Sequence, residues 1–109
     1  GEALEYVNVH MTEDISVQDI ADALNVSRYY LSHEFKKSTG YGLWNYVISK
    51  RLVYSQKLLA EGASVTEACY ESGFKDYAHF IKSFTKTFGC SPKQYGKSDD
   101  SIYMVKLNL

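Results

Sequence analysis

Apolar residues recur every three or four positions through most of this chain of 109 residues, and that spacing places them on one face of a helix. In residues 2–11 the pattern predicts a leading helix, and in residues 42–61 it predicts a long helix with a broad apolar face. Residues 98–109 instead alternate, which suggests a strand or an extended arm of unknown role. The pattern therefore predicts an all-α fold for the body of the chain.

The same pattern contains an internal repeat. The stretch SVQDIADALNV at residues 16–26 matches SVTEACYESGF at residues 64–74 with an offset of 48 residues. After one extra residue the match continues at an offset of 49, where Leu31 pairs with Phe80. A duplicated unit of this length is typical of a supersecondary motif that buries its apolar face only against a neighbour.

Each copy has the local signals of two helices joined by a tight turn. The first helix opens on a capping box, in which a serine caps the helix and an acid three residues later reaches back. A residue that tolerates positive φ follows this helix, and a residue that suits an N-cap starts the next one. This order predicts a helix-turn-helix unit, although a generic helical hairpin used only for packing would give a similar pattern. The residues concerned are Ser16, Asp19, Asn25 and Ser27 in the first copy and Ser64, Glu67, Gly73 and Asp76 in the second.

These signals organise residues 2–97 as one domain with two halves. From residue 43 to residue 60 the linking helix would be about 27 Å long at about 1.5 Å per residue. Successive major-groove faces of B-DNA lie about 34 Å apart, so a spacer of this order suits two recognition helices on one duplex. It would equally suit a core helix that only joins two lobes. The expected parts are a first helix-turn-helix at 16–40, the linking helix at 42–61, a second helix-turn-helix at 64–89 and a closing helix at 92–96.

On the second helix of each copy, the side chains that do not face the core form a stripe. Leu31 and Phe35 mark the inward face in the first copy, and the stripe lies about 130° from it at about 100° per residue. We expect the stripe to face an external partner. Its members are Tyr29, Ser32, His33 and Lys36 in the first copy and Ala78, Ile81, Lys82 and Thr85 in the second.

Charge is distributed unevenly along the chain. The net charge is −1, which taken alone argues against nucleic acid as a partner. Residues 27–57, however, hold six Lys or Arg against one acid, and residues 75–97 hold five against one. Residues 1–26 hold six acids and no Lys or Arg. The two basic blocks coincide with the two predicted recognition helices, which favours a polyanionic partner.

An ordered set of residues extends through both copies and the linking helix: Ala21, Ser27, Leu31, Phe35, Gly40, Arg51, Leu58, Leu59, Gly73, Phe74, Phe80, Phe84, Phe88, Gly89, Ser91, Pro92 and Tyr95. This set resembles the DNA-binding region of the AraC/XylS family of bacterial transcriptional regulators over roughly residues 2–97. The resemblance implies about seven helices, two helix-turn-helix subdomains joined by a long linker helix, and insertion into two adjacent major grooves of double-stranded DNA. It also implies activation more often than repression, RNA polymerase as a partner, a cytoplasmic location, and a sensory or dimerisation domain upstream.

The chain departs from the family where Arg is common and this sequence has His33 and Lys82. Arg grips guanine O6 and N7 in a bidentate manner, and His and Lys do so less rigidly, so a strong preference for G-rich sites is not expected. Ala78 and Ile81 suit apolar contact with thymine methyl groups. For each of these residues, simple surface exposure is the alternative. The expected base contacts are Tyr29, Ser32, His33, Tyr77, Ala78, Ile81 and Lys82, and the expected phosphate contacts are Arg28, Lys36, Lys37, Lys75 and Lys86.

Other side chains are expected to have structural roles. We favour Arg51 as an internal brace, held by glutamates of the preceding helix, over a DNA backbone contact. Tyr30 and His79 occupy equivalent side positions and are expected to be partly buried. Cys69 takes the close-packing position of Ala21, so a pairing with His79 as nucleophile and base receives little support.

The sequence gives little support for an enzymatic or a membrane function. The two cysteines have no metal-ligand spacing with the histidines, so no metal or cofactor is expected and the thiols are expected to be reduced. No apolar stretch approaches the roughly 20 residues of a membrane helix. Because the chain starts at Gly1, we expect it to be part of a longer protein. The overall acidic balance leaves one other function open, a degenerate helix-turn-helix module that binds protein with weak or no affinity for DNA.

Overall fold

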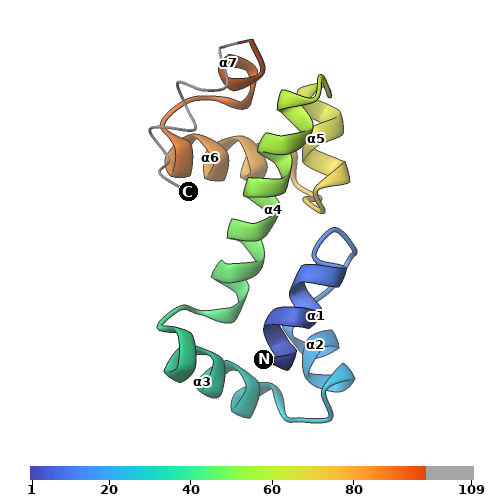
Figure 1. The fold of residues 1–109 in the computed structure, drawn as a ribbon, viewed down its shortest axis with the longest axis vertical. Helices are drawn as coiled ribbons and strands as arrows, with labels where there is room; N and C mark the ends of the chain where they lie inside the picture. The colour runs from blue at the N-terminus through green and yellow to red at the C-terminus, as the bar shows by residue number, and fades with distance from the viewer. Residues whose placement is uncertain (98–109) are drawn as a thin grey trace. The chain divides into compact units, whose positions relative to one another are not determined.

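Seven helices form within residues 1–97, the part of the chain that this computed structural model describes (Figure 1). This architecture confirms the predicted all-α fold and the long linking helix. The strand or arm predicted at residues 98–109 lies outside the described residues. The helices are α1 (Glu2–His10), α2 (Val17–Ala23), α3 (Arg28–Thr39), α4 (Leu43–Ala60), α5 (Val65–Glu71), α6 (Tyr77–Phe88) and α7 (Pro92–Lys97).

The chain divides into two units within α4. Unit 1 comprises Gly1–Arg51, and unit 2 starts at Leu52. Within unit 1, α2 packs against α1 and α3, and within unit 2, α5, α6 and α7 pack against one another. Each unit therefore contains one copy of the predicted helix-turn-helix, α2–α3 in unit 1 and α5–α6 in unit 2.

Both copies begin with the capping box that the sequence predicts. The N–H of Asp19 donates to Ser16 Oγ at 3.1 Å, and the N–H of Ser16 donates to Asp19 Oδ2 at 2.9 Å. In the second copy, the N–H of Glu67 donates to Ser64 Oγ at 3.0 Å and that of Ser64 to Glu67 Oε1 at 2.8 Å. Each box satisfies backbone donors that have no partner within the helix.

The two turns are also alike. Asn25 and Gly73 adopt positive φ values of 56° and 105°. Just beyond Asn25, the N–H of Val26 donates to the carbonyl of Ala21 at 3.1 Å, and the equivalent bond in the second copy has the same length. This six-residue closure is a Schellman motif, which ends the first helix and aims the chain into the second. The predicted turn chemistry is confirmed in both copies.

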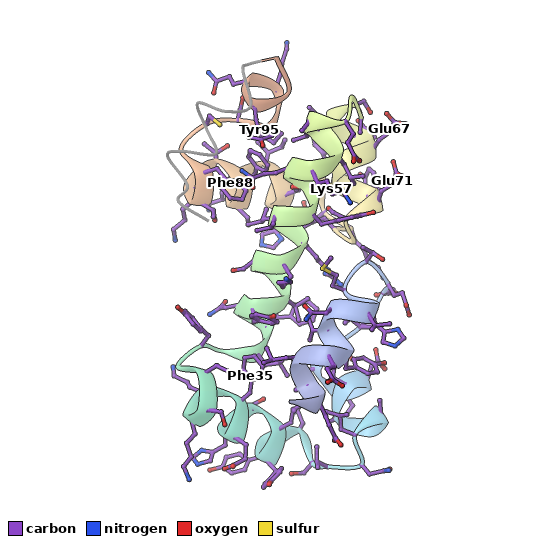
Figure 2. All side chains as sticks on the ribbon, in the orientation of Figure 1. Phe35, Lys57, Glu67, Glu71, Phe88 and Tyr95 are labelled. Carbon is purple, nitrogen blue, oxygen red and sulfur yellow. The ribbon has the colours of Figure 1, made fainter. Side chains whose placement is uncertain are left out.

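The cores of the two units use different side chains. In unit 1 the core is mainly aliphatic, and Phe35 contacts Tyr46 with ring centroids 5.6 Å apart. In unit 2, Phe84 is fully buried, and its ring lies 4.7 Å from Phe88 and 5.9 Å from Tyr95, both labelled in Figure 2. The buried residues of the unit 1 core are Val7, Ile15, Ile20, Ala21, Leu31, Phe35, Leu43 and Val47.

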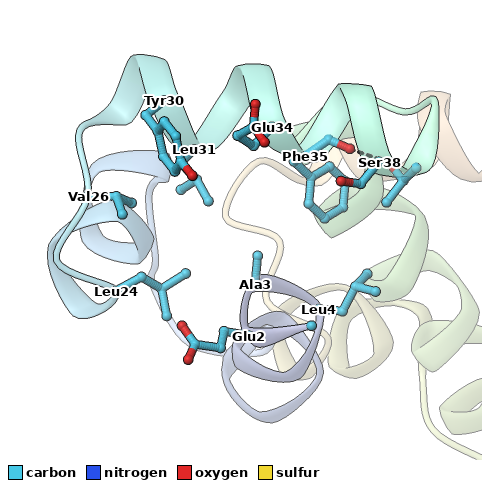
Figure 3. A pocket seen from close by; sticks show the side chains of 12 residues that line it. Glu2, Ala3, Leu4, Leu24, Val26, Tyr30, Leu31, Glu34, Phe35 and Ser38 are labelled. Atoms are coloured by element: carbon cyan, nitrogen blue, oxygen red, sulfur yellow. Dashed lines mark hydrogen bonds between the residues drawn. The ribbon is translucent and has the colours of Figure 1, made fainter.

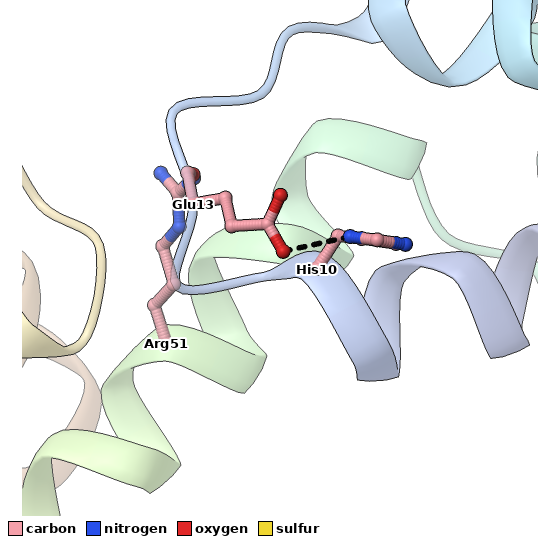
Figure 4. Close-up of polar contacts among 3 residues, drawn as sticks. All are labelled: His10, Glu13 and Arg51. Atoms are coloured by element: carbon pink, nitrogen blue, oxygen red, sulfur yellow. Dashed lines mark hydrogen bonds and ion pairs between the residues drawn. The ribbon is translucent and has the colours of Figure 1, made fainter.

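Arg51 braces the N-terminal segment of unit 1 (Figure 4). Its side chain is 5% exposed, its Nε donates to the carbonyl of Met11 at 2.6 Å, and its Nη2 donates to that of Glu13 at 3.0 Å. Burial lowers the pKa of the guanidinium, and the carboxylate of Asp14 opposes that effect. The structural role is confirmed, but its predicted cause was wrong. Backbone carbonyls hold Arg51, whereas the Glu13 carboxylate pairs with His10 at 2.7 Å.

Cys69 and Cys90 are both buried, and no disulfide bond joins them. Burial raises the pKa of the Cys69 thiol, and the nearby Asp76 carboxylate adds to that effect. A raised thiol pKa keeps Cys69 protonated and therefore a poor nucleophile at neutral pH. Within residues 1–97, no helix is long and apolar enough to cross a membrane.

Candidate nucleic-acid interface

The N-cap and the buried face of α3 determine which of its side chains point outward. Ser27 Oγ accepts from the N–H of Tyr30 at 3.0 Å, which starts the helix one residue later. Leu31 and Phe35 are buried against the core. The stripe about 130° away must therefore face solvent, as predicted. Its members Tyr29, Ser32, His33 and Lys36 are all exposed.

Tyr29 is the centre of this surface. It is 79% exposed, and its ring is stacked on that of His33, with centroids 5.9 Å apart and planes 10° from parallel. One surface recess is lined by Tyr29, Ser32, His33, Lys36 and Lys37. The structure thus brings five of the six predicted contact residues of the first copy around one concavity.

A second recess adds residues that the sequence analysis missed. It is lined by Val17 and Gln18 of α2 together with Arg28, Tyr29 and Ser32 of α3. Gln18 Nε2 donates to Asp22 Oδ1 at 2.8 Å, which leaves the amide oxygen of Gln18 as a further acceptor at this surface. No local sequence signal places Gln18 at this surface, because its approach to α3 depends on how α2 packs on that helix.

The second copy presents a different surface. Asp76 Oδ1 accepts from the N–H of His79 at 3.0 Å, and Phe80, Phe84 and Phe88 are buried along one face of α6. The predicted contact residues Tyr77, Ala78 and Lys82 are exposed, as is Thr85.

Ile81 departs from the expectation of an outward side chain, because it is only half-exposed. It lies beside the aromatic face of α6, next in sequence to the buried Phe80. Thr85 also differs from its counterpart Lys36. Its Oγ1 donates to the carbonyl of Ile81 at 2.8 Å, so the hydroxyl is used within the helix.

The five predicted phosphate contacts all have exposed side chains. Arg28, Lys36 and Lys37 lie on α3, Lys86 lies in the last turn of α6, and Lys75 lies in the turn that precedes α6. Tyr30 and His79 were expected to be partly buried, and this was wrong. Tyr30 is 55% exposed, and His79 is exposed although its ring touches Phe74 edge-on at 5.9 Å.

Known proteins share this sequence pattern and this fold. A family model described as a helix-turn-helix domain matches residues 20–98. The regulatory protein PocR of Salmonella typhimurium is 32% identical over 94 residues, which cover 85% of this chain and 31% of PocR. The lactose operon transcription activator of Staphylococcus xylosus is 30% identical over 94 residues, which cover 85% of this chain and 34% of the activator.

The solved structure of an AraC-type DNA-binding-domain regulator from Chromobacterium violaceum superimposes with a TM-score of 0.78 at 27% identity. The match covers 87% of this chain and 86% of that one. The chain spans between 30% and 59% of the length of the first curated relatives it matches. The matched family model, the relatives and the doubled motif agree, and the chain belongs to the AraC/XylS family of helix-turn-helix transcriptional regulators.

Proposed function

We propose that the chain binds double-stranded DNA sequence-specifically, with α3 and α6 inserted into two adjacent major grooves. The observation that carries this proposal is the repeated recognition helix, which buries one face and exposes basic and hydrogen-bonding side chains on the other. Exposed Lys and Arg neutralise phosphates, and side chains near the start of a recognition helix reach base edges. The C. violaceum regulator, described as containing an AraC-type DNA-binding domain, supports the same activity.

In the first copy, Tyr29, Ser32 and His33 read base edges. Ser32 and His33 each offer single hydrogen bonds, and the Tyr29 ring packs on a thymine methyl group or donates to a phosphate. The stacked arrangement of Tyr29 and His33 restricts both rings before DNA arrives, which reduces the entropy lost on binding. The phosphate contacts of this copy are Arg28, Lys36 and Lys37.

In the second copy, Tyr77, Ala78, Ile81 and Lys82 read base edges. Ala78 and the exposed part of Ile81 provide apolar contact, and Lys82 donates to a base or a phosphate. The phosphate contacts of this copy are Lys75 and Lys86.

The longer protein to which such a domain belongs acts as a transcription activator in the cytoplasm. The S. xylosus relative is named a transcription activator, which supports this direction of regulation. An activator must bring or hold RNA polymerase, and a regulator must receive a signal, so RNA polymerase and an upstream sensory or dimerisation domain are its partners.

Selection from random duplex oligonucleotides at low salt tests the DNA activity. We expect one enriched motif with two conserved segments about one helical turn apart, and hydroxyl-radical footprinting should protect both. Affinity should fall steeply as salt rises, because bound phosphates release counterions. If no motif is enriched, even with an artificially dimerised chain, the protein-interaction module becomes the better description.

Two alanine variants test the assigned residues on the selected site. His33→Ala in α3 and Lys82→Ala in α6 should each cost about 1–3 kcal/mol in binding free energy and relax selectivity at one position. Lys93→Ala is the matched control, because Lys93 is an exposed lysine on α7 and belongs to neither recognition helix. Fluorescence anisotropy measures all three. Parental affinity in both test variants would contradict the base-reading assignment.

A further inference from the structure

A groove of ≈ 440 Å³ opens in unit 1 on the side of α3 that faces α1 (Figure 3). Its walls come from the first turn of α1, from the turn between α2 and α3, and from α3 itself. Leu31 and Phe35, which are 6% and 5% exposed, form its apolar base. Leu4, Leu24 and Val26 are half-buried around that base. The stripe that reads DNA in the proposed function lies on another face of the same helix.

Unit 2 places aromatic rings at the positions equivalent to this part of unit 1. The counterparts of Val26 and Leu31 are Phe74 and Phe80, whose rings are in contact at 5.1 Å. The counterpart of Tyr30 is His79, whose ring also touches Phe74. The positions of Val26 and Leu31 in unit 1 thus hold larger, aromatic side chains in unit 2. A change at Val26 can therefore test whether the groove depends on a small side chain there.

The charged side chains that line the groove are all acidic. Glu2 and Glu34 are carboxylates in the lining, and the lining residues include no Lys, Arg or His. Gly1, the first residue of this chain, also lies in the lining. The ring of Tyr30 is 55% exposed, so an aromatic face is available to a positive group. The apolar base, the exposed Tyr30 ring and the two carboxylates together favour a ligand that has an apolar body and one positive charge.

We propose that this groove is a binding site for a small molecule that joins an apolar body to a protonated amine. The volume lies within the range of about 300–1,000 Å³ that small-ligand sites occupy, and such sites combine mostly apolar walls with a few polar groups. The apolar body would cover Leu31 and Phe35, and the amine would lie between Tyr30 and the carboxylates. The site itself does not depend on the proposed DNA activity.

Three probes with the same hydrocarbon body test the site: 4-phenylbutylamine, 4-phenylbutan-1-ol and 4-phenylbutanoate. Each is titrated into the ¹⁵N-labelled chain with the α-amino group of Gly1 acetylated, so that the carboxylates alone set the charge. We expect amide shifts at Tyr30, Leu31 and Glu34, and an amine affinity at least about 5-fold above that of the alcohol. Equal affinities, a preference for the carboxylate, or shifts elsewhere only would overturn the proposal.

Two variants separate charge from shape. Glu34→Gln keeps the size of the side chain and should remove most of the advantage of the amine over the alcohol. Val26→Phe introduces the residue found at the equivalent place in unit 2 and should weaken all three probes about 10-fold by filling the groove. Circular dichroism checks the folding of both variants. An amine preference that survives when Glu2→Gln is combined with Glu34→Gln would overturn the assigned role of the carboxylates even if Val26→Phe failed to fold.

Occupation of the groove should also alter DNA binding, and this consequence rests on the proposed function. A ligand that contacts both α1 and the recognition helix α3 would favour one placement of α3, so saturating amine should tighten DNA binding about 3-fold. Anisotropy at constant ionic strength measures the effect, and linkage requires DNA to tighten the amine by the same factor. Unchanged DNA affinity would refute the coupling. Absence of any DNA binding would instead refute the proposed function.

Discussion

The recognition helix of unit 1 buries a single aromatic ring, Phe35, whereas that of unit 2 buries three, Phe80, Phe84 and Phe88. The backbones of the two copies nevertheless share their capping boxes, their positive-φ turns and the bond that closes each turn. This difference teaches that caps and turns define the helix-turn-helix, while the core behind it accepts aliphatic or aromatic packing. Core chemistry can therefore diverge after duplication without loss of the motif.

The exposed faces of the two helices have diverged as well. In the first copy all four stripe positions end in a hydrogen-bonding group, on Tyr29, Ser32, His33 and Lys36. Their counterparts in the second copy are Ala78, Ile81, Lys82 and Thr85, of which Lys82 alone offers a free polar group, because the Thr85 hydroxyl donates to its own helix. We therefore expect the two half-sites on DNA to be read by different chemistry.

The largest expected effect sharpens the comparison of the cores. Phe84→Ala should lower the free energy of unfolding by about 3–5 kcal/mol, because it empties a fully buried site. Phe35→Ala is the equivalent change in unit 1 and should cost about 1 kcal/mol less, since Phe35 has one ring partner and Phe84 has three. Native-state amide hydrogen exchange reports each unit separately. Equal losses in the two units would contradict the aromatic cluster as the source of the difference.

A second prediction concerns a brace described only in unit 1. Arg51→Met should destabilise unit 1 by about 2–3 kcal/mol, because the carbonyls of Met11 and Glu13 lose a charged donor. Arg51→Lys is the control, and it should recover part of the loss, since one ammonium cannot reproduce the two separate bonds of a guanidinium. Exchange of the α1 amides would accelerate in Arg51→Met. Identical exchange in the two variants would show that geometry is unimportant there.

Most of the fold could be predicted from the sequence because its signals are local. These signals act within a few residues: a capping serine, a residue that adopts positive φ and the helical spacing of apolar positions. All three can be recognised in one copy and occur again in the other. The partners of Arg51 could not be predicted, because they are backbone carbonyls 40 and 38 residues away in the chain. A buried guanidinium must have hydrogen-bond acceptors, but the sequence does not show which groups they are.

The sequence predicts which faces of α3 and α6 are exposed, but it is less reliable for individual side chains. A helical wheel places Ile81 and Ser32 at equivalent angles, yet Ile81 is partly buried whereas Ser32 is exposed. Gln18 was missed because its approach to Arg28 and Tyr29 depends on how α2 packs on α3. The exposure of Tyr30 was missed for a related reason, since it depends on how α1 and the turn between α2 and α3 pack beside α3. Predicting such features requires knowing how the helices pack, and a local sequence pattern does not contain that information.

A third prediction tests the divergence of the two exposed faces. On a selected DNA site, replacing thymine by uracil removes only the 5-methyl group. In the half-site bound by α6, we expect a loss of about 0.8 kcal/mol for each contacted methyl, because Ala78, Ile81 and the Thr85 methyl offer apolar contact. In the half-site bound by α3 the loss should be smaller, since hydrogen bonds dominate there. The half-sites are assigned with Lys82→Ala and His33→Ala, and equal sensitivity to uracil would contradict the divergence.

The smallest expected effect concerns the capping box of unit 2 and depends on pH. The N–H of Ser64, and then its side chain, hold the pKa of Glu67 below its ordinary value. A lowered folded-state pKa means that ionised Glu67 stabilises α5 above the ordinary glutamate pKa, and that this contribution disappears as the pH falls through the lowered value. The free energy of unfolding of the parent should therefore exceed that of Glu67→Gln at about pH 7, and the two should converge as the pH falls through the lowered pKa. Urea denaturation over a series of acidic pH values measures the gap, and Glu71→Gln is the matched control because Glu71 lies in the last turn of the same helix. A gap of constant size would show that the carboxylate charge contributes nothing beyond the hydrogen bond, which the glutamine amide can also accept.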